Sequence, residues 1–305
     1  MACSETLVEA ALEVLNTADP AEKARLGDAI ANRWLKGEIS IPFHSGEDSS
    51  VPCRPARPSN VRRVAPNMMP KLGKGGSLLS RQAMLHSLVH TESWAIDLSW
   101  DIIARFGRKE RMPKEFFTDF VKVAQDEGRH FMLLATRLEE VGSFYGAFAV
   151  HDGLWDSAIQ TSQDLSSRLV VEHCIHEARG LDVLPSTISR FRNGGDDGTA
   201  KLLETVVYPE EITHCAAGLK WFKYMCRKKM EMEGHLATIN NSDGTAVDLE
   251  QIQEEKMMIE VFHNTAKRYF RGPLKPPFNI EARTAAGFGR EWYEPLVFKD
   301  FKVPD

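Results

Sequence analysis

The sequence contains few cysteines, and no two of them have the spacing of a C-x-x-C motif. Its five cysteines, Cys3, Cys53, Cys174, Cys215 and Cys226, are scattered over 305 residues without a C-x-x-C pair. An odd number of scattered cysteines does not make a disulfide framework, and it favours a reducing compartment. We therefore expect a cytoplasmic protein, with the nucleus as the other reducing compartment.

Long apolar runs are absent as well. No run of 18 apolar residues occurs anywhere, so we expect no membrane-spanning helix and no membrane partner. The first residues, "MACSETLVEAALEVL", carry Glu5 and Glu9 where a secretory signal would have basic residues. The sequence therefore predicts neither a signal peptide nor a membrane anchor.

The chain has no excess of positive charge. Its net charge of −5 gives no general attraction to nucleic acid or to an anionic membrane. One stretch differs, because no acidic residue lies between Asp48 and Glu92, where seven basic residues occur. Such a run is typical of a solvated loop, but it also offers a surface to an acidic partner such as RNA. The sequence thus disfavours a nucleic-acid partner without excluding one.

Alternating strand patterns are almost missing, and helical periods dominate instead. Asp19-Pro20 predicts the start of the second of two short N-terminal helices. The proline- and glycine-rich stretch 39–77 predicts an irregular arm. Apolar residues at steps of three and four then predict four long helices and a fifth. Their expected ranges are about 78–106, 114–141, 157–192, 197–231 and 246–271.

The long stretch between the second and third long helices predicts the topology. "GSFYGAFAVHDGLWD" is too long for a tight helix hairpin and predicts a crossover connection. We expect an all-α, ferritin-like four-helix bundle with a crossover, extra N-terminal helices, and a C-terminal helix plus arm. The expected segments are 1–77, the N-terminal helices and arm; 78–232, the bundle with a dimetal site; and 233–305, the C-terminal helix and tail.

Each long helix carries an acidic residue in register with its apolar stripe. On the first helix Glu92 lies between Val89 and Ile96, and on the second Glu127 lies between Val123 and Phe131. The third and fourth helices offer Glu177 and Glu211 in the same way. Four carboxylates facing an apolar interior would be costly without a bound cation. A pair of divalent metal ions would meet that need.

Histidine spacing supports the same interpretation. His130 follows Glu127 by three residues and His214 follows Glu211 by three, so each pair shares a helix face. A third such pair, Glu260 and His263, has no partner helix with a matching Glu. The distance from Glu92 to Glu127 is 35 residues and that from Glu177 to Glu211 is 34, so the unit occurs twice. The predicted metal ligands are Glu92, Glu127, His130, Glu177, Glu211 and His214.

Further polar residues accompany these ligands. Glu172 is a rival to Glu177, but on an α-helix it lies off the stripe, and its distance to Glu211 breaks the repeat. Four acids are candidates for orienting the ligands from behind, because metal-bound histidines usually donate their second ring proton to a carboxylate. They are Asp126, Glu210, Asp97 and Asp182. Three histidines are candidates for lining the site, although a single histidine on a helix is more often structural; they are His90, His173 and His151.

Six segments carry a resemblance to a known family. "HTESWAIDLSWDIIARF", "VAQDEGRHF", "YGAFAVHDGLW", "EARGLD", "PEEITHCAAGLKWF" and "PPFNIEARTAAGF" occur in this order. They resemble the motifs of an uncharacterised ferritin-like family known as domain of unknown function 455, over about residues 65–290. The opening of the chain resembles the plant-like branch. The sequence departs from the family pattern at Ser93-Trp94 and at Glu172-His173.

"DEGRH" also resembles the Asp-Glu-x-Arg-His signature of bacterial di-iron monooxygenases. This resemblance implies that Glu127 and His130 are ligands and that Asp126 lies behind them. The family resemblance implies the ferritin-like fold and a metal site, but it supplies no substrate.

Together these patterns predict an oxidoreductase. Two Fe ions, with Mn or a mixed Fe/Mn pair as alternatives, would activate O₂ to hydroxylate, desaturate or otherwise oxidise a small organic substrate. No flavin or iron–sulfur motif is present, so we expect an external electron donor. The alternatives are metal handling without organic chemistry, such as iron oxidation, storage or peroxide defence, and a helical binding module with a structural dimetal site. We expect a monomer or homodimer.

Overall fold

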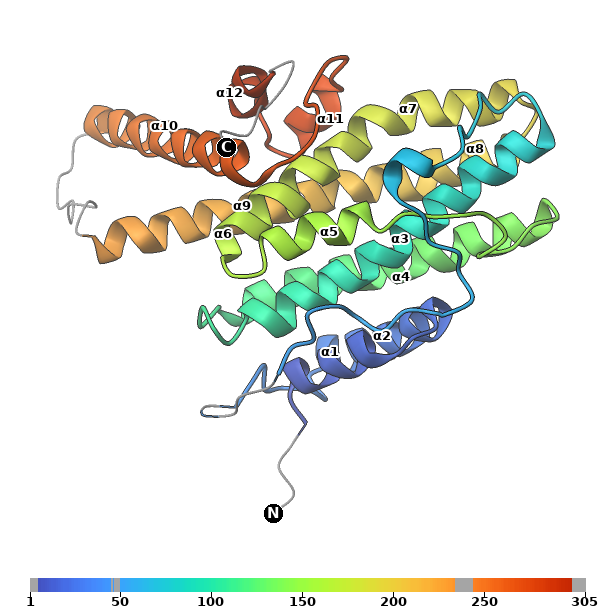
Figure 1. The fold of residues 1–305 in the computed structure, drawn as a ribbon. Helices are drawn as coiled ribbons and strands as arrows, with labels where there is room; N and C mark the ends of the chain where they lie inside the picture. Colours follow the sequence, from blue (N-terminus) through green and yellow to red (C-terminus); the bar gives the residue numbers. More distant parts are fainter. Residues whose placement is uncertain (1–4, 45, 47–49, 234–243, 298–305) are drawn as a thin grey trace. The chain divides into compact units, whose positions relative to one another are not determined.

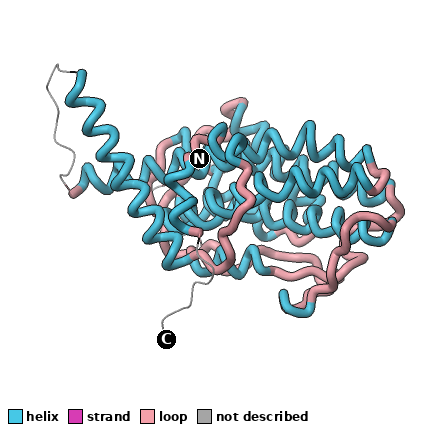
Figure 2. Tube along the Cα trace, turned by 90° about the horizontal axis from the view of Figure 1, so that it is seen from above, coloured by secondary structure: helices cyan, strands magenta, loops and turns pink. Residues whose placement is uncertain are grey.

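The computed structural model describes residues 5–44, 46, 50–233 and 244–297, with side chains omitted for 244–250. Throughout these ranges the regular structure is helical, and Figure 2 shows helices joined by loops. The only strand-like pairing in the described ranges is an isolated bridge between Arg63 and Val150. The predicted all-α class is therefore confirmed, whereas the ferritin-like bundle stays a prediction.

The chain divides into two compact units. Unit 1 comprises Met1–Leu165 and Val183–Glu210, and unit 2 comprises Ser166–Asp182 and Glu211–Asp305. This division groups residues by contact, whereas the three segments expected from the sequence follow chain order and stay a prediction. No helix in the described ranges combines the length and the apolar character that a membrane span requires.

Unit 1 is built around two long antiparallel helices. Its α3 (Leu78–Phe106) packs along α4 (Lys114–Glu140), and α1 (Leu7–Asn16) and α2 (Pro20–Leu35) pack on them (Figure 1). The predicted helices 78–106 and 114–141 are thus confirmed to within a residue. The other described helices that lie wholly within unit 1 are η1 (Pro66–Met68), α5 (Gly153–Gln160), α8 (Asp197–Leu202) and η3 (Leu203–Val207).

Local signals explain why the N-terminal helices start where they do. The Asp19 carboxylate accepts hydrogen bonds from the backbone N–H groups of Ala21 and Glu22, both at 2.9 Å, and Pro20 occupies the first helical position. At α1, Thr6 and Glu9 form a reciprocal capping box. The start at Asp19-Pro20 is the one that the sequence predicts.

A buried ion-pair cluster fixes the N-terminal segments to α3. Asp97 on α3 is paired with Lys23 of α2, and its other oxygen accepts a hydrogen bond of 2.9 Å from Arg57. Arg57 also donates to the Ser93 carbonyl and hydroxyl, at 2.9 and 2.7 Å. Because all three charged side chains are almost fully buried, each depends on the others for compensation.

The helices of unit 2 are α6 (Leu165–Arg168), η2 (Leu169–His176), α9 (Tyr208–Met232), α10 (Gly244–Tyr269), α11 (Ile280–Ala285), α12 (Arg290–Tyr293) and η4 (Glu294–Leu296). The first residues of α6 and of α9 belong to unit 1. The helix α7 (Glu177–Asn193) begins in unit 2 and ends in unit 1. Four buried aromatic side chains pack edge to face in the core of unit 2. They are Phe222, Phe262, Phe288 and Trp292.

A second buried ion pair fixes the C-terminal segment of unit 2. Asp182 accepts hydrogen bonds of 2.9 and 2.6 Å from Arg283, which is fully buried, and one of 2.8 Å from the Asn279 N–H. These hydrogen-bond donors lie almost one hundred residues after Asp182 in the chain, so sequence spacing does not reveal them.

The third and fourth long helices are less regular than predicted. The expected helix 157–192 begins earlier, at α5, and is interrupted after Gln160. In the interruption the Thr161 hydroxyl donates to the Ala158 carbonyl at 3.0 Å, so a polar side chain competes with the helical backbone. The expected helix 197–231 runs from α8 through η3 into α9. Both regions contain π-helical turns, η2 and η3, which the helical period did not reveal.

Candidate metal centre

Unit 1 brings three of the predicted ligands together. Glu92 projects from α3, and Glu127 and His130 project from one face of α4, where a three-residue step places them side by side. Each of the three offers one ligand atom within 4.8 Å of the others. Glu92 is 6 % exposed, Glu127 is 1 % exposed and His130 is fully buried. We call these residues triad 1.

The imidazole of His130 is oriented as a metal ligand would be. Its Nε2 lies 2.6 Å from the Glu210 carboxylate, and its Nδ1 lies 3.5 Å from Glu127 and 3.7 Å from Glu92. A ligating histidine typically donates one ring N–H to a carboxylate and directs the other nitrogen at the ion. Glu210 therefore has the position expected of an acid that supports a ligand.

The surroundings of His130 are dominated by carboxylates. Burial alone would lower its pKa, but hydrogen bonding with Glu127, Glu210 and Glu92 outweighs burial and raises the pKa to about 12. A proton on His130 thus partly neutralises the buried carboxylates. A divalent cation would compensate the same charge, and a carboxylate–imidazole donor set suits iron or manganese.

Arg129 provides a positive charge next to two carboxylates near triad 1. Its guanidinium donates to Asp126 at 2.6 Å and to Glu210 at 2.8 Å. Partial burial would raise the pKa of Glu210, but the hydrogen bonds from His130 and Arg129 lower it. Glu210 is therefore held as a carboxylate that can accept from His130. For Asp126 the structure shows the pairing with Arg129, and its role behind a ligand stays a prediction.

Unit 2 brings together the other three predicted ligands. Glu177 begins α7, and Glu211 and His214 lie on α9, with His214 Nδ1 at 3.7 Å from the Glu211 carboxylate. Each again offers a ligand atom within 4.8 Å of the other two. Glu211 and His214 are buried and Glu177 is half-buried. We call these residues triad 2, which has the same composition as triad 1.

Thiol groups near triad 2 are poor metal ligands. Burial, reinforced by the negative charge of Glu177, raises the pKa of Cys215 to about 12, and burial likewise raises that of Cys174. Both side chains are therefore neutral thiols, whereas metal ligation needs the thiolate. The four described cysteines are all free, as the sequence predicts.

A π-helical turn stands directly before Glu177. The turn η2 carries Glu172, which is 1 % exposed and lies 3.8 Å from His176. The argument against Glu172 as a ligand assumed α-helical spacing, which does not hold within a π-turn. It is Glu177, however, that joins Glu211 and His214 in the group that could hold an ion.

Comparison with known proteins identifies the family. A family model described as "Protein of unknown function (DUF455)" matches residues 16–294, which is most of the chain. The chain belongs to the DUF455 family. Over 283 residues this DUF455 chain is 29 % identical to an uncharacterized protein of Haemophilus influenzae, covering 90 % of the chain and 88 % of the relative. No solved structure matches the DUF455 chain.

The comparison confirms the family suggested by the sequence motifs. The ferritin-like bundle, the plant-like branch and the identity of the metal stay predictions. Two acids of the DUF455 chain that were expected behind the ligands have other partners: Asp97 is held by Lys23 and Arg57, and Asp182 by Arg283. These contacts tie terminal segments to their units.

The histidines predicted to line the site lie in different places. His90 Nδ1 is 2.9 Å from the Tyr145 hydroxyl, and the His151 ring accepts from the Gly153 N–H at 3.1 Å. Both line a cavity in unit 1 that sequence reasoning missed. His173 is buried in η2, and its backbone carbonyl closely approaches Gly218 of α9.

The third Glu-x-x-His pair serves a structural purpose. His263 Nε2 lies 3.1 Å from the Glu291 carbonyl and 3.2 Å from the Trp292 carbonyl, so it connects α10 with α12. It belongs to neither triad.

Proposed function

We propose that the protein is a dimetal carboxylate oxidoreductase, in which triad 1 holds one metal ion and triad 2 holds another. The observation that carries the proposal is the buried triad Glu92, Glu127 and His130, with the His130 imidazole directed at the two carboxylates by Glu210. Triad 2 repeats the same donor set on a second pair of helices. Two carboxylates and one imidazole per ion match the ligand set of carboxylate-bridged dimetal bundles.

The negative charge of the buried carboxylates favours a cation as the ligand of the triads. Isolated carboxylates lose several kcal/mol each when they leave water, and a single protonated histidine cannot balance two of them. A structural core would place apolar side chains at Glu92 and Glu127, which interrupt the apolar stripes of α3 and α4. Retaining both carboxylates in buried positions therefore favours a binding role.

The protein's own groups have separate tasks in the proposed site. Glu210 accepts the Nε2 proton of His130 and so fixes the tautomer that leaves Nδ1 available. Arg129 holds Glu210 and Asp126 in place through its guanidinium. Burial of the ligands excludes bulk water, which strengthens electrostatic interactions among them. When bound, an iron pair would supply the capacity to activate O₂ with electrons from an external donor.

Metal content tests whether the protein binds two metal ions. We expect protein purified without added metal to contain about two iron or manganese ions per chain. Glu127→Ala should lower that content by about half or more, because triad 1 would lose one of its two carboxylates. Glu139→Ala, at an exposed glutamate on the same helix, is the matched control and should leave it unchanged. A metal-free wild type, or equal metal in both variants, would refute the proposal.

Two further measurements separate the expected chemistry from simple metal binding. Magnetic coupling between the ions, seen by electron paramagnetic resonance, would support one shared centre, whereas two isolated ions would argue for separate sites. Mixing the Fe(II)-loaded protein with O₂ should produce a transient charge-transfer absorption. If O₂ leaves the spectrum unchanged, the oxidase proposal fails, and manganese or a structural metal role becomes the better explanation.

A further inference from the structure

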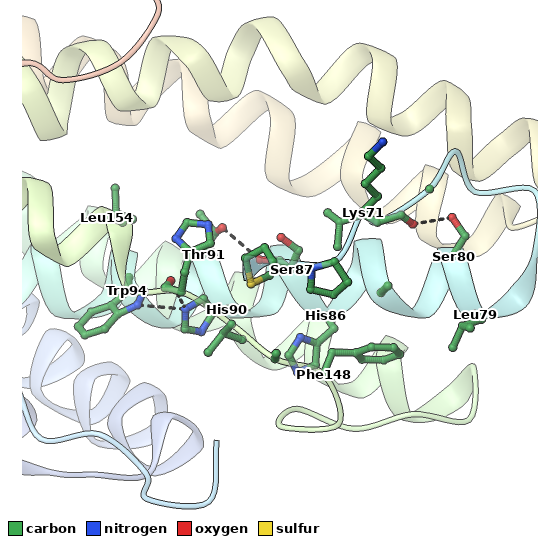
Figure 3. A pocket seen from close by; sticks show the side chains of 18 of the residues that line it. Lys71, Leu79, Ser80, His86, Ser87, His90, Thr91, Trp94, Phe148 and Leu154 are labelled. Atoms are coloured by element: carbon green, nitrogen blue, oxygen red, sulfur yellow. Dashed lines mark hydrogen bonds between the residues drawn. The ribbon is translucent and has the colours of Figure 1, made fainter. Parts of the chain in front are cut away.

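A cavity of about 420 Å³ lies in unit 1, between the outer face of α3, the arm at 69–73 and the chain at 148–154. Figure 3 shows Trp94, His90, Ser87 and Thr91 along one side of α3, with Phe148 on the neighbouring loop. Its volume falls within the range of small-molecule sites in proteins. All of its walls belong to unit 1.

The cavity is separate from triad 1. Its α3 lining follows the positions 83, 87, 90, 91 and 94, which form one helical stripe. Glu92 is two residues from His90 and from Trp94, and two residues correspond to about 200° around an α-helix. The body of α3 therefore stands between the cavity and the Glu92 carboxylate. A molecule in the cavity would not touch the ligands of triad 1.

The lining is largely apolar, and two of its hydroxyls, Ser80 and Thr91, already donate to the Leu72 and Ser87 carbonyls, at 2.7 and 3.1 Å. No aspartate or glutamate lines the cavity. The polar groups are serine and threonine hydroxyls, histidines and the ammonium group of Lys71. In His86, Nε2 accepts from the Gly146 N–H at 2.9 Å, so the proton of the neutral ring resides on Nδ1. No hydrogen bond among the described residues uses that Nδ1 donor.

The rim of the cavity combines a cation with exposed apolar side chains. Lys71 is exposed and forms no ion pair with any described residue, and Figure 3 shows its side chain extending away from Trp94 and Phe148. Leu79 also lines the cavity and is 65 % exposed. The interior is thus suited to an apolar body, and the rim to a negatively charged end in contact with water.

We propose that this cavity binds an amphipathic monoanion, namely a carboxylic acid with an unbranched apolar body of about ten carbons. The volume lies in the range of cavities that hold small organic ligands, and a chain of about ten carbons with its carboxylate is a ligand of that class. The apolar body would contact Trp94 and Phe148, and the carboxylate would meet Lys71. The proposal does not rest on the metal centre.

Calorimetric titration with decanoate tests the site. We expect one molecule bound per chain. Ala83→Leu projects a larger side chain into the cavity and should weaken binding at least about tenfold. Ala135→Leu makes the same change on α4 at a position of similar burial outside the cavity, and it should leave the affinity unchanged. Ser87→Leu is the second filling variant, to be used if Ala83→Leu does not fold.

Preference for a negative charge is tested with decyltrimethylammonium, which has an unbranched chain of similar length and the opposite charge. It should bind at least about tenfold more weakly than decanoate. Lys71→Glu should weaken decanoate binding roughly three- to tenfold, as expected for an exposed charge, whereas Lys122→Glu on the exposed side of α4 should not.

Three results would overturn the proposal: no decanoate binding, equal binding of the cation, or full affinity in both filling variants. Decanoate binding should persist in Glu127→Ala, and Ala83→Leu should keep the metal content of the wild type. A failure of the metal centre and a failure of this cavity are therefore separate outcomes.

Discussion

Replacing Asp97 with asparagine should destabilise the protein strongly while leaving its metal content intact. Asp97 is fully buried on α3 between two buried cations, Lys23 of α2 and Arg57 of the arm. It lies five residues after Glu92, a position from which the sequence suggested a role behind the metal ligands. The structure instead shows Asp97 as the acceptor that holds the N-terminal segments.

The magnitude follows from the burial of all three charges. Removing the acid leaves two cations without compensation, and breaking a buried pair in this way costs roughly 3–5 kcal/mol. Lys23→Met should cost less, about 0–2 kcal/mol, because Asp97 keeps Arg57 and the methionine fills a similar volume. Burial already lowers the pKa of Lys23, against the pull of Asp97, so its charge is partly disfavoured in the folded state.

Thermal unfolding of metal-free protein, followed by far-ultraviolet circular dichroism, measures this asymmetry. At about 2–4 °C per kcal/mol, Asp97→Asn should lower Tm by roughly 6–20 °C, and Lys23→Met by several degrees at most. Metal per chain, measured on each variant before the metal is removed, should stay at the wild-type level. The reasoning would be refuted if Asp97→Asn kept its Tm but lost its metal, or if Lys23→Met were the more damaging change.

Two further predictions concern packing and pH. A Cβ on Gly218 would lie 1.9 Å from the His173 carbonyl oxygen, so Gly218→Ala should lower the free energy of unfolding in urea by at least about 1–3 kcal/mol. Gly128→Ala is the control, because the nearest atom to its Cβ would be 3.4 Å away, and it should cost no stability. Equal losses of stability in the two variants would refute the packing argument. Burial lowers the pKa of His86 to about 4 and that of His90, with Arg57 contributing, to about 3. Because the unfolded chain binds these protons more readily, each histidine should remove about 2 kcal/mol of stability between pH 7 and pH 5. His86→Gln should flatten this dependence relative to wild type, and an unchanged pH profile would contradict it.

The sequence predicted the parts of the fold that regular periodicity controls. The helices α3 and α4 lie where the three- and four-residue steps place them, because the helical period continues over seven turns or more. The composition of both triads could also be predicted, since each combines a glutamate of one helix with a Glu-x-x-His step on one face of another. Periodicity and spacing are local properties, and local properties can be read without the fold.

The features that escaped prediction depend on distant partners or on small local departures. The π-turn η3 ends just before Tyr208-Pro209, and a proline cannot donate to the carbonyl four residues back, which is one reason for a wider turn there. The cavity beside α3 needs the arm at 69–73 to fold over Ala83 and Ser87. A stripe of small side chains at 83, 87 and 91 was the available signal, but it does not show what covers it.

The two buried aspartates show that a sequence repeat can identify residues with a common role without revealing what that role is. Asp97 follows Glu92 by five residues and Asp182 follows Glu177 by five, so a shared role beside the ligands was a reasonable expectation. Both do have a similar role, but it is to hold a terminal segment through buried cations, Lys23 and Arg57 in one case and Arg283 in the other. Spacing identified residues that must be compensated, whereas only the fold shows which cation does so. The same distinction applies to the triads: spacing identified their carboxylates, and we propose that a bound metal ion supplies the compensating charge.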